Sequence, residues 1–184
     1  MSSTPSSQKS SVVVRPAVLA DAASIAELGA HVFSATYSYS IDPEELQVFL
    51  QQSYSTTAVV GDLSKASKNI LVATRPDGKL AGFAYLDRGS TEPCIADIDC
   101  AVELQRIYVH PSAHGTGVGR SLANEAEDLA RQQGFQHMWL GVWEENTKAV
   151  RVYEHWGYKR VGEHNFAIGS LVQRDFVMLK CLEE

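Results

Sequence analysis

Three glycines stand at alternate positions where an apolar, strand-like stretch gives way to a helix-like run. Gly115, Gly117 and Gly119 follow residues 107–109, and Arg120 comes directly after them. A helix that starts after such a loop leaves its first backbone N–H groups unpaired and carries a partial positive charge at that end. Glycines let a ligand approach this backbone closely, and an arginine adds a charged contact. The spacing therefore predicts an anion site, for which phosphate is the natural ligand.

The loop does not match two common nucleotide-binding motifs. A Walker A loop requires GxxxxGK[ST], but His114 stands five residues before Gly119, and Arg120 takes the place of the lysine. A Rossmann loop requires GxGxxG soon after the first strand, whereas these glycines follow a GxGxG spacing in the middle of the chain. On spacing alone, glycines that only permit tight packing explain the loop equally well.

The residues around the loop resemble the GNAT superfamily of N-acetyltransferases. Two stretches carry the resemblance, RIYVHPSAHGTGVGRSL and NTKAVRVYEHWGY, and it extends over about residues 11–182. Four stretches look like the PaiA-type spermidine/spermine N-acetyltransferases: FSATY, EELQVFL, WLGVWEENTKAVRVYEHWGY and RVGEHNFAIG. The resemblance implies a GNAT fold and transfer of an acetyl group from acetyl-CoA to an amine.

The resemblance also implies where acetyl-CoA binds. In that superfamily the pyrophosphate lies on the glycine loop, and the pantetheine arm pairs with the preceding strand where this strand splays from its neighbour. The residues implied in cofactor binding are Ile107, Tyr108, Val109, His114, Gly115, Thr116, Gly117, Val118, Gly119, Arg120 and Asn146, the last for a pantetheine amide. His114 departs from the superfamily pattern, which has Arg or Gln there, so one fixed charge near the phosphates is lost at neutral pH.

Acetyl transfer to an amine needs a base for the ammonium proton and an acid for the departing thiolate. Glu103 matches a glutamate that acts through a water in many members, although some use a water chain alone. Tyr153 matches the general acid of the superfamily, but its spacing alone is typical of a core aromatic residue. Strand alternation predicts that one face is shared by Glu103, Gln105, Ile107 and Val109.

The superfamily holds its acceptor against two early helices, which here carry Phe33, Tyr37 and Tyr54. Aromatic rings can hold a cation there, although ordinary helix packing also explains them. Phe33, Tyr37 and Gln105 are the expected substrate-binding residues. Cys100 is expected to be a buried or half-buried thiol rather than a nucleophile, because the superfamily transfers acetyl directly.

Composition sets a few further limits. The 184 residues carry a net charge of −6, which argues mildly against a nucleic-acid surface. This charge suits a cationic substrate, although a charge of this size usually serves solubility alone. We expect no membrane contact, because the apolar runs are too short to cross a bilayer and the N-terminus lacks the apolar core of a signal peptide. Cys94, Cys100 and Cys181 have no metal-ligand spacing, so we expect reduced thiols, no metal and a cytoplasmic protein.

Hydrophobic periodicity predicts one mixed α/β domain over residues 11–184, after a disordered Ser-rich tail at residues 1–10. The expected order is β-α-α-β-β-β-α-β-α-β-β, the GNAT fold, with a splayed central strand. Residues 88–100 between the hairpin strands and the central strand are expected to form a loop.

Local signals fix several element ends. Asp42 is expected to cap the second helix, with Glu45 completing a capping box. Asp77 and Gly78 are expected to turn a hairpin between two strands. Gly134 is expected to end the helix that follows the glycine loop, in a left-handed conformation.

Three functions are compatible with these residues. The first is an acetyl-CoA-dependent N-acetyltransferase for a small primary amine, with polyamines as the first candidate. The second is a protein acetyltransferase acting on lysine or N-terminal amines. The third is a CoA-binding regulatory module without catalysis, against which the retained Glu103 and Tyr153 argue. Dimers are common in the superfamily, which leaves a homodimer open.

Overall fold

The computed structural model describes residues 12–183, so the tail expected at residues 1–10 lies outside the described residues. Seven strands form one sheet in the order β1-β2-β3-β4-β5-β7-β6. They are β1 (Val13–Pro16), β2 (Lys68–Thr74), β3 (Leu80–Asp87), β4 (Ala101–Val109), β5 (His137–Trp143), β6 (Lys159–Ile168) and β7 (Leu171–Cys181). Neighbouring strands are antiparallel except β4 and β5, which are parallel. The predicted mixed α/β sheet is confirmed.

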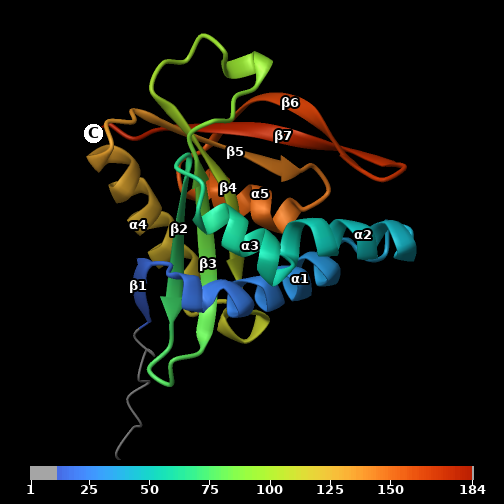
Figure 1. Ribbon diagram of the computed structural model, residues 1–184. Helices are drawn as coiled ribbons and strands as arrows, with labels where there is room; N and C mark the ends of the chain where they lie inside the picture. The colour runs from blue at the N-terminus through green and yellow to red at the C-terminus, as the bar shows by residue number, and fades with distance from the viewer. Residues whose placement is uncertain (1–11, 184) are drawn as a thin grey trace, which may run out of the picture.

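Helices cover both faces of the sheet (Figure 1). They are α1 (Ala22–Tyr37), α2 (Pro43–Tyr54), α3 (Thr56–Leu63), α4 (Val118–Gln132) and α5 (Thr147–His155). Apolar residues of α1 and α3 bury one face of β2 and β3, whereas α4 and α5 bury the opposite face of the sheet. Within residues 12–183, no helix has both the length and the apolar character needed to span a bilayer.

Helix α3 was not predicted, so the expected order lacked one helix. Only Ser55 separates α2 from α3, and its hydroxyl accepts a hydrogen bond from the N–H of Ala58 at 3.2 Å. A serine in this position caps the first turn of a helix. The eight residues of α3 are too few for a clear helical periodicity, and the helix is held by tertiary packing through buried Val59.

The expected capping box of α2 is only half formed. Asp42 accepts hydrogen bonds from the N–H groups of Glu44 and Glu45, as a capping aspartate should. The carboxylate of Glu45 does not return to Asp42. It accepts instead from the N–H and the hydroxyl of Ser170 at 2.8 and 2.9 Å, in the turn between β6 and β7. A side chain expected to serve its own helix therefore holds a distant hairpin against that helix.

Two of the predicted turns are confirmed. Gly78 turns the β2–β3 hairpin with a φ of 79°, and Gly134 follows α4 with a φ of 84°. The segment 88–100 is a loop with one short 3-10 turn, Pro93–Ile95, and the buried side chain of Ile95 packs on β5 and β7. Cys100 was expected to be buried or half-buried and is exposed, with a φ of 53°, because the chain turns there immediately before β4 begins.

Candidate active site

The central strand β4 leaves its neighbour β5 after three residues. The two strands pair only over Ala101–Glu103 and His137–Trp139, although β4 continues to Val109 and β5 to Trp143. Backbone groups of β4 that face the gap beyond Glu103 therefore lie outside the sheet ladder. The expected splay of the central strand is confirmed.

A β-bulge changes which side chains of β4 share a face. Tyr85 on β3 lies opposite Arg106, and Leu86 lies opposite Leu104, so Gln105 is the extra residue. Such a bulge interrupts the alternation of side chains along the strand. The expectation that Glu103 and Gln105 share a face with Ile107 and Val109 is therefore wrong. Ile107 and Val109 pack on the α4 side with Val102 and Leu104, and Glu103 and Gln105 lie on the other side.

A pocket of about 350 Å³ opens where β4 and β5 separate. Its walls come from α1, α2 and α5 and from strands β4 to β7. Among the residues that line it are Phe33, Tyr37, Tyr54, Glu103, Gln105, Arg106, Ile107, Tyr108, Asn146, Tyr153, His164, Gln173 and Asp175. The structure thus brings the expected base, the expected acid and the expected acceptor residues into one cavity. A volume of this size suits a small molecule.

Glu103 lies at the point of divergence and lines the pocket. Its Oε2 atom is buried, with no hydrogen-bond partner among residues 12–183. Burial raises the pKa of Glu103 above that of a free glutamate, and the negative charge of Asp87 acts in the same direction. A hydrogen-bond donor or a proton that reaches this carboxylate from the pocket would therefore stabilise it.

Tyr153 reaches the same pocket from α5. Its ring packs edge-on against the rings of Trp156 and Tyr158, with centroids 5.8 and 5.9 Å away. Burial raises the pKa of Tyr153 to about 12, so the phenol keeps its proton at neutral pH. Asn146 caps α5 by accepting from the N–H of Ala149 at 3.2 Å, and its side chain also lines the pocket.

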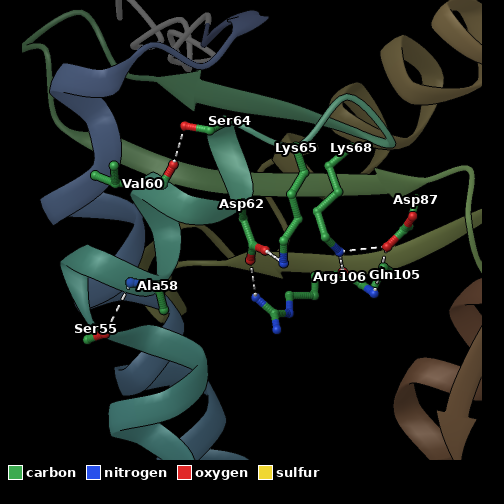
Figure 2. A network of polar contacts seen from close by, with 10 residues as sticks. All are labelled: Ser55, Ala58, Val60, Asp62, Ser64, Lys65, Lys68, Asp87, Gln105 and Arg106. Atoms are coloured by element: carbon green, nitrogen blue, oxygen red, sulfur yellow. Dashed lines mark hydrogen bonds and ion pairs between the residues drawn. The ribbon is translucent and has the colours of Figure 1, made fainter.

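Gln105 lines the pocket, but its amide is engaged in a polar network (Figure 2). Lys68 donates to the Gln105 Oε1 atom and, at 2.7 Å, to the Oδ2 atom of Asp87. The Nε2 atom of Gln105 lies 3.4 Å from the same Asp87 oxygen. Three neighbouring strands supply these residues, so the network fixes the pocket side of β4.

Arg106 is a pocket residue that was not predicted. Its guanidinium lies 4.9 and 5.0 Å from the ring centres of Tyr54 and Tyr85. Its Nη1 atom lies 3.7 Å from the Oδ2 atom of Asp62, and the Oδ1 atom of the same carboxylate accepts a hydrogen bond from Lys65 (Figure 2). Flanking rings and one carboxylate stabilise a half-buried guanidinium. Spacing along β4 gave no signal for it, since all of its partners come from other elements.

The aromatic residues expected at the acceptor site form one wall of the pocket. Phe33 packs on Tyr37 and Tyr54, with ring centres 4.6 and 5.7 Å apart. The hydroxyl groups of Tyr54 and Tyr108 lie 2.7 Å apart. Burial raises the pKa of Tyr37, and the negative charge of Asp175 adds to this effect. Tyr108 thus presents its side chain to the pocket as well.

The glycine loop lies at the other end of β4. Gly115 and Gly117 have φ values of 73° and 91°, and Gly117 is the N-cap residue of α4. Only glycine adopts such values at little cost. Gly119 has an ordinary helical position instead, and a Cβ there would meet Val109 at 3.5 Å.

The first backbone N–H groups of α4, from Val118 to Arg120, point out of the helix end without a partner among residues 12–183. The guanidinium of Arg120 lies 5.6 Å from the ring of Trp156. His114 is exposed, and its Nε2 atom lies 3.1 Å from the carbonyl oxygen of Val109. The hydroxyl of Thr116 donates to the carbonyl of Ala113, and the Val118 side chain is buried. Thr116 and Val118 therefore have only backbone N–H groups to offer an anion.

Three further polar residues line the pocket and were not predicted as site residues: His164, Gln173 and Asp175. Gln173 and Asp175 alternate on β7, and His164 lies opposite Asp175 on β6. The sequence signal was available, since a strand whose inward face carries a glutamine and an aspartate breaks the usual apolar pattern. Their meeting with Glu103 depends on the order of strands in the sheet, which periodicity does not provide.

Comparison with known proteins agrees with this geometry. Residues 30–158 match the Acetyltransferase (GNAT) family. An uncharacterised N-acetyltransferase of Mycobacterium bovis is 31% identical over 162 residues, which cover 88% of this chain and 98% of that protein.

Two solved structures share the fold at low sequence identity. The PaiA N-acetyltransferase of Thermoplasma acidophilum, in complex with coenzyme A, has a TM-score of 0.74 and 23% identity, covering 93% of this chain and 99% of that one. The Salmonella typhimurium protein yncA, with its cofactor acetyl-CoA, has a TM-score of 0.65 and 22% identity, covering 95% and 96%. The chain therefore belongs to the acetyltransferase (GNAT) family and is an N-acetyltransferase.

Proposed function

We propose that this N-acetyltransferase moves the acetyl group of acetyl-CoA directly to a primary amine of a small molecule, with polyamines as the first candidates. One observation carries the proposal: Glu103 and Tyr153 line the same pocket, at the point where β4 separates from β5. A thioester placed in the gap would then have a carboxylate on one side and a phenol on the other.

The amine must lose a proton before it can attack, because an ammonium group has no lone pair. Glu103 is the proposed acceptor of that proton, directly or through water, since its unpartnered Oε2 atom faces a buried environment. The raised pKa of Glu103 makes its carboxylate a better proton acceptor than that of a free glutamate.

Attack of the amine nitrogen on the thioester carbonyl forms the C–N bond, and the C–S bond then breaks. The departing thiolate needs a proton, which Tyr153 is proposed to donate from its hydroxyl. Backbone groups of β4 beyond Glu103, free of the sheet ladder, are proposed to pair with the amide-containing pantetheine arm. The N–H groups at the start of α4 and Arg120 are proposed to hold the pyrophosphate.

The cysteines support direct transfer rather than an acetylated enzyme. Cys94, Cys100 and Cys181 are exposed, and none lines the pocket. An attacking amine in the pocket would therefore meet the thioester without a thiol nearby to act first. We also propose that the protein works in the cytoplasm, where exposed thiols stay reduced.

The acceptor class rests on the pocket walls and on charge. Aromatic rings from α1 and α2 face the carboxyl groups of Glu103 and Asp175 across a small cavity, and the chain carries a net charge of −6. Rings and carboxylates together favour an ammonium-bearing guest. Polyamines meet both conditions.

A free-thiol release assay with acetyl-CoA and a panel of amines tests the proposal. The panel would hold spermidine, spermine, simple alkylamines and lysine-containing peptides, with product masses recorded for each. Turnover of small amines, with an added mass of one acetyl group, is the expected result. Turnover of peptides alone would point to a protein acetyltransferase, and turnover of no amine would remove the proposed acceptor class.

A further inference from the structure

The far wall of the pocket is built by two strands that the proposed chemistry does not use. Gln173 and Asp175 stand two residues apart on β7, so both side chains point to the same face of the sheet. His164 on β6 lies opposite Asp175 in register. All three line the pocket that contains Glu103.

This wall presents hydrogen-bond acceptors without matching donors. Gln173 is 7% exposed, and its Oε1 atom has no partner among residues 12–183. The Nε2 atom of Gln173 donates to the Oδ1 atom of Asp175 at 3.0 Å, which directs the Gln173 carbonyl away from that carboxylate. A buried acceptor without a donor carries an uncompensated desolvation cost. A guest with several N–H donors would remove this cost.

Asp175 has no lysine or arginine partner within the described part of the chain. Among the described residues, the ionisable side chain at ion-pair distance from Asp175 is His164, whose Nε2 atom lies 3.8 Å from Oδ2. The other ring nitrogen of His164, Nδ1, lies 2.7 Å from Glu92 Oε1, so His164 is shared between two carboxyl groups. Burial raises the pKa of Asp175, as expected for a carboxyl group that lacks a full cationic partner.

Aromatic rings and an open space beside Gly141 complete the surroundings of Asp175. Tyr37 lines the pocket, its ring lies 5.5 Å from that of Trp143, and Trp143 pairs with Asp175 across β5 and β7. Gly141 keeps the space clear, because a Cβ there would come within 3.3 Å of the His164 ring and 3.7 Å of Asp175 Oδ2. A carboxylate, an amide oxygen and aromatic faces are the groups that recognise an ammonium ion.

We propose that Gln173 and Asp175 form a subsite for a second, non-reacting ammonium group of the acceptor. The enzyme therefore prefers diamines and polyamines over monoamines of equal length. This inference rests on the proposed function, in which Glu103 receives the reacting amine. The two sites are separate: Glu103 lies on β4 and the subsite on β7, at different walls of one cavity.

The test compares 1,4-diaminobutane with butylamine, which differ by one terminal amino group. The variant Asp175→Asn keeps the shape and the oxygen that Gln173 contacts but removes the charge. We expect it to lower kcat/KM for the diamine ten- to a hundredfold and for butylamine no more than about threefold. Gln173→Met, which removes only the amide, should lower the diamine value less than Asp175→Asn does. Asp97→Asn, an exposed residue, is the matched control and should leave both values unchanged.

Calorimetry of each amine on the CoA-bound protein separates this inference from the proposed function. Weaker binding of the diamine to Asp175→Asn, with butylamine binding retained, supports the subsite even where turnover is low. Equal losses for both amines overturn the subsite while acetylation of amines still stands. Loss of CoA affinity in Asp175→Asn also overturns it, because these residues would then serve the cofactor. If no amine binds and no amine is turned over, both the subsite and the proposed function are overturned.

Discussion

Burial controls the protonation of single residues in this pocket, in ways that fit opposite tasks. Tyr153 keeps its proton because an apolar environment disfavours the phenolate, and its raised pKa suits a group that must hold a proton until the thiolate appears. Glu103, on the facing strand, becomes a stronger base through the same effect. Two groups pushed in the same direction by burial can thus serve as acid and base, because their free pKa values are far apart.

Replacing Tyr153 with phenylalanine tests the acid directly. We expect Tyr153→Phe to lower kcat ten- to a thousandfold, about 1.4–4 kcal/mol of transition-state stabilisation, with CoA affinity retained in calorimetry. Tyr158→Phe is the matched control. It removes a buried hydroxyl from a ring 5.9 Å away that does not line the pocket, and should change kcat less than twofold. An unchanged rate in Tyr153→Phe would exclude Tyr153 from the reaction.

At this scale the sequence was informative where a motif existed. Glu103 and Tyr153 were identified by resemblance, and the structure places them in one pocket. Arg106, Gln173 and Asp175 were missed, because each becomes a pocket residue only through contacts with distant elements. A strand pattern shows which residues share a face, but not what that face meets.

Among the elements, the start of α4 combines backbone conformation with an exposed helix end. Gly117→Glu places bulk and negative charge at the N-cap, where a φ of 91° already disfavours a side chain. We expect CoA affinity to fall more than a hundredfold, measured by calorimetry.

The other end of α4 offers a control for backbone strain. Gly134→Glu introduces the same side chain at a φ of 84°, beyond the last turn of the helix. The two substitutions share the strain but differ in location. Comparable losses of CoA affinity in both would mean that general destabilisation, and not a phosphate site, explains the result.

The polar network beside the pocket ties three strands together. The Lys68 side chain is 8% exposed and its Asp87 partner 13%. Lys68→Met leaves the carboxylate without its cation, so we expect the free energy of unfolding to fall by about 3 kcal/mol in urea titrations. Lys65→Met removes a pair whose lysine is 57% exposed and should cost less than about 1 kcal/mol.

The pH dependence of this loss provides a further check. Burial alone would raise the pKa of Asp87, but hydrogen bonds from Lys68 and the Gly89 N–H lower it below the ordinary value. A depressed carboxyl pKa stabilises the fold above the unfolded value of about 4 and loses that contribution as the pH falls further. The difference between Lys68→Met and the parent should therefore shrink in acid. A difference independent of pH would contradict the ion pair.

Short local signals were reliable for turns and less so for caps and short helices. The β2–β3 turn and the end of α4 follow from glycines that need positive φ. Helix α3 was missed because eight residues show little periodicity. Glu45 was assigned to its own helix, because no local signal indicates that Ser170 in the β6–β7 turn would offer its carboxylate two better donors.

For the whole molecule, activity and stability make opposite demands on Glu103. Its pKa is raised on folding, so the folded protein binds this proton more tightly than the unfolded chain. The stabilising contribution is present below the unfolded value of about 4.3 and is lost as the pH rises through the folded pKa. The ionised form of Glu103 is therefore the form that the fold disfavours.

Glu103→Gln should show both sides of this conflict. We expect the variant to have a higher Tm than the parent at pH 8, with the difference disappearing toward pH 4, and a kcat about a hundredfold lower. Scanning calorimetry over pH and the thiol assay measure the two effects. Glu125→Gln, on the exposed side of α4, should change neither. A normal kcat in Glu103→Gln would assign proton removal to water alone.

The arrangement of strands was the least accessible feature from periodicity. β7 inserts between β5 and β6, so strands adjacent in the sheet are not consecutive in the chain. The expected fold came from the resemblance, because hydrophobic patterns define elements but not their neighbours. The pocket depends on this order, since β4 and β7 carry its two carboxylates on either side of β5.

The extra residue at Gln105 divides β4 into two parts that can change independently. Glu103 belongs to the first part, whereas Ile107 and Val109 follow the second alignment and lead into the glycine loop. Substrate preference can therefore diverge among relatives by exchanges upstream of the bulge, without altering the segment that leads into the glycine loop. Deleting Gln105 would leave Glu103 and Ile107 three residues apart, a spacing at which ordinary strand alternation still places them on opposite faces, so the two parts would merge into one regular strand.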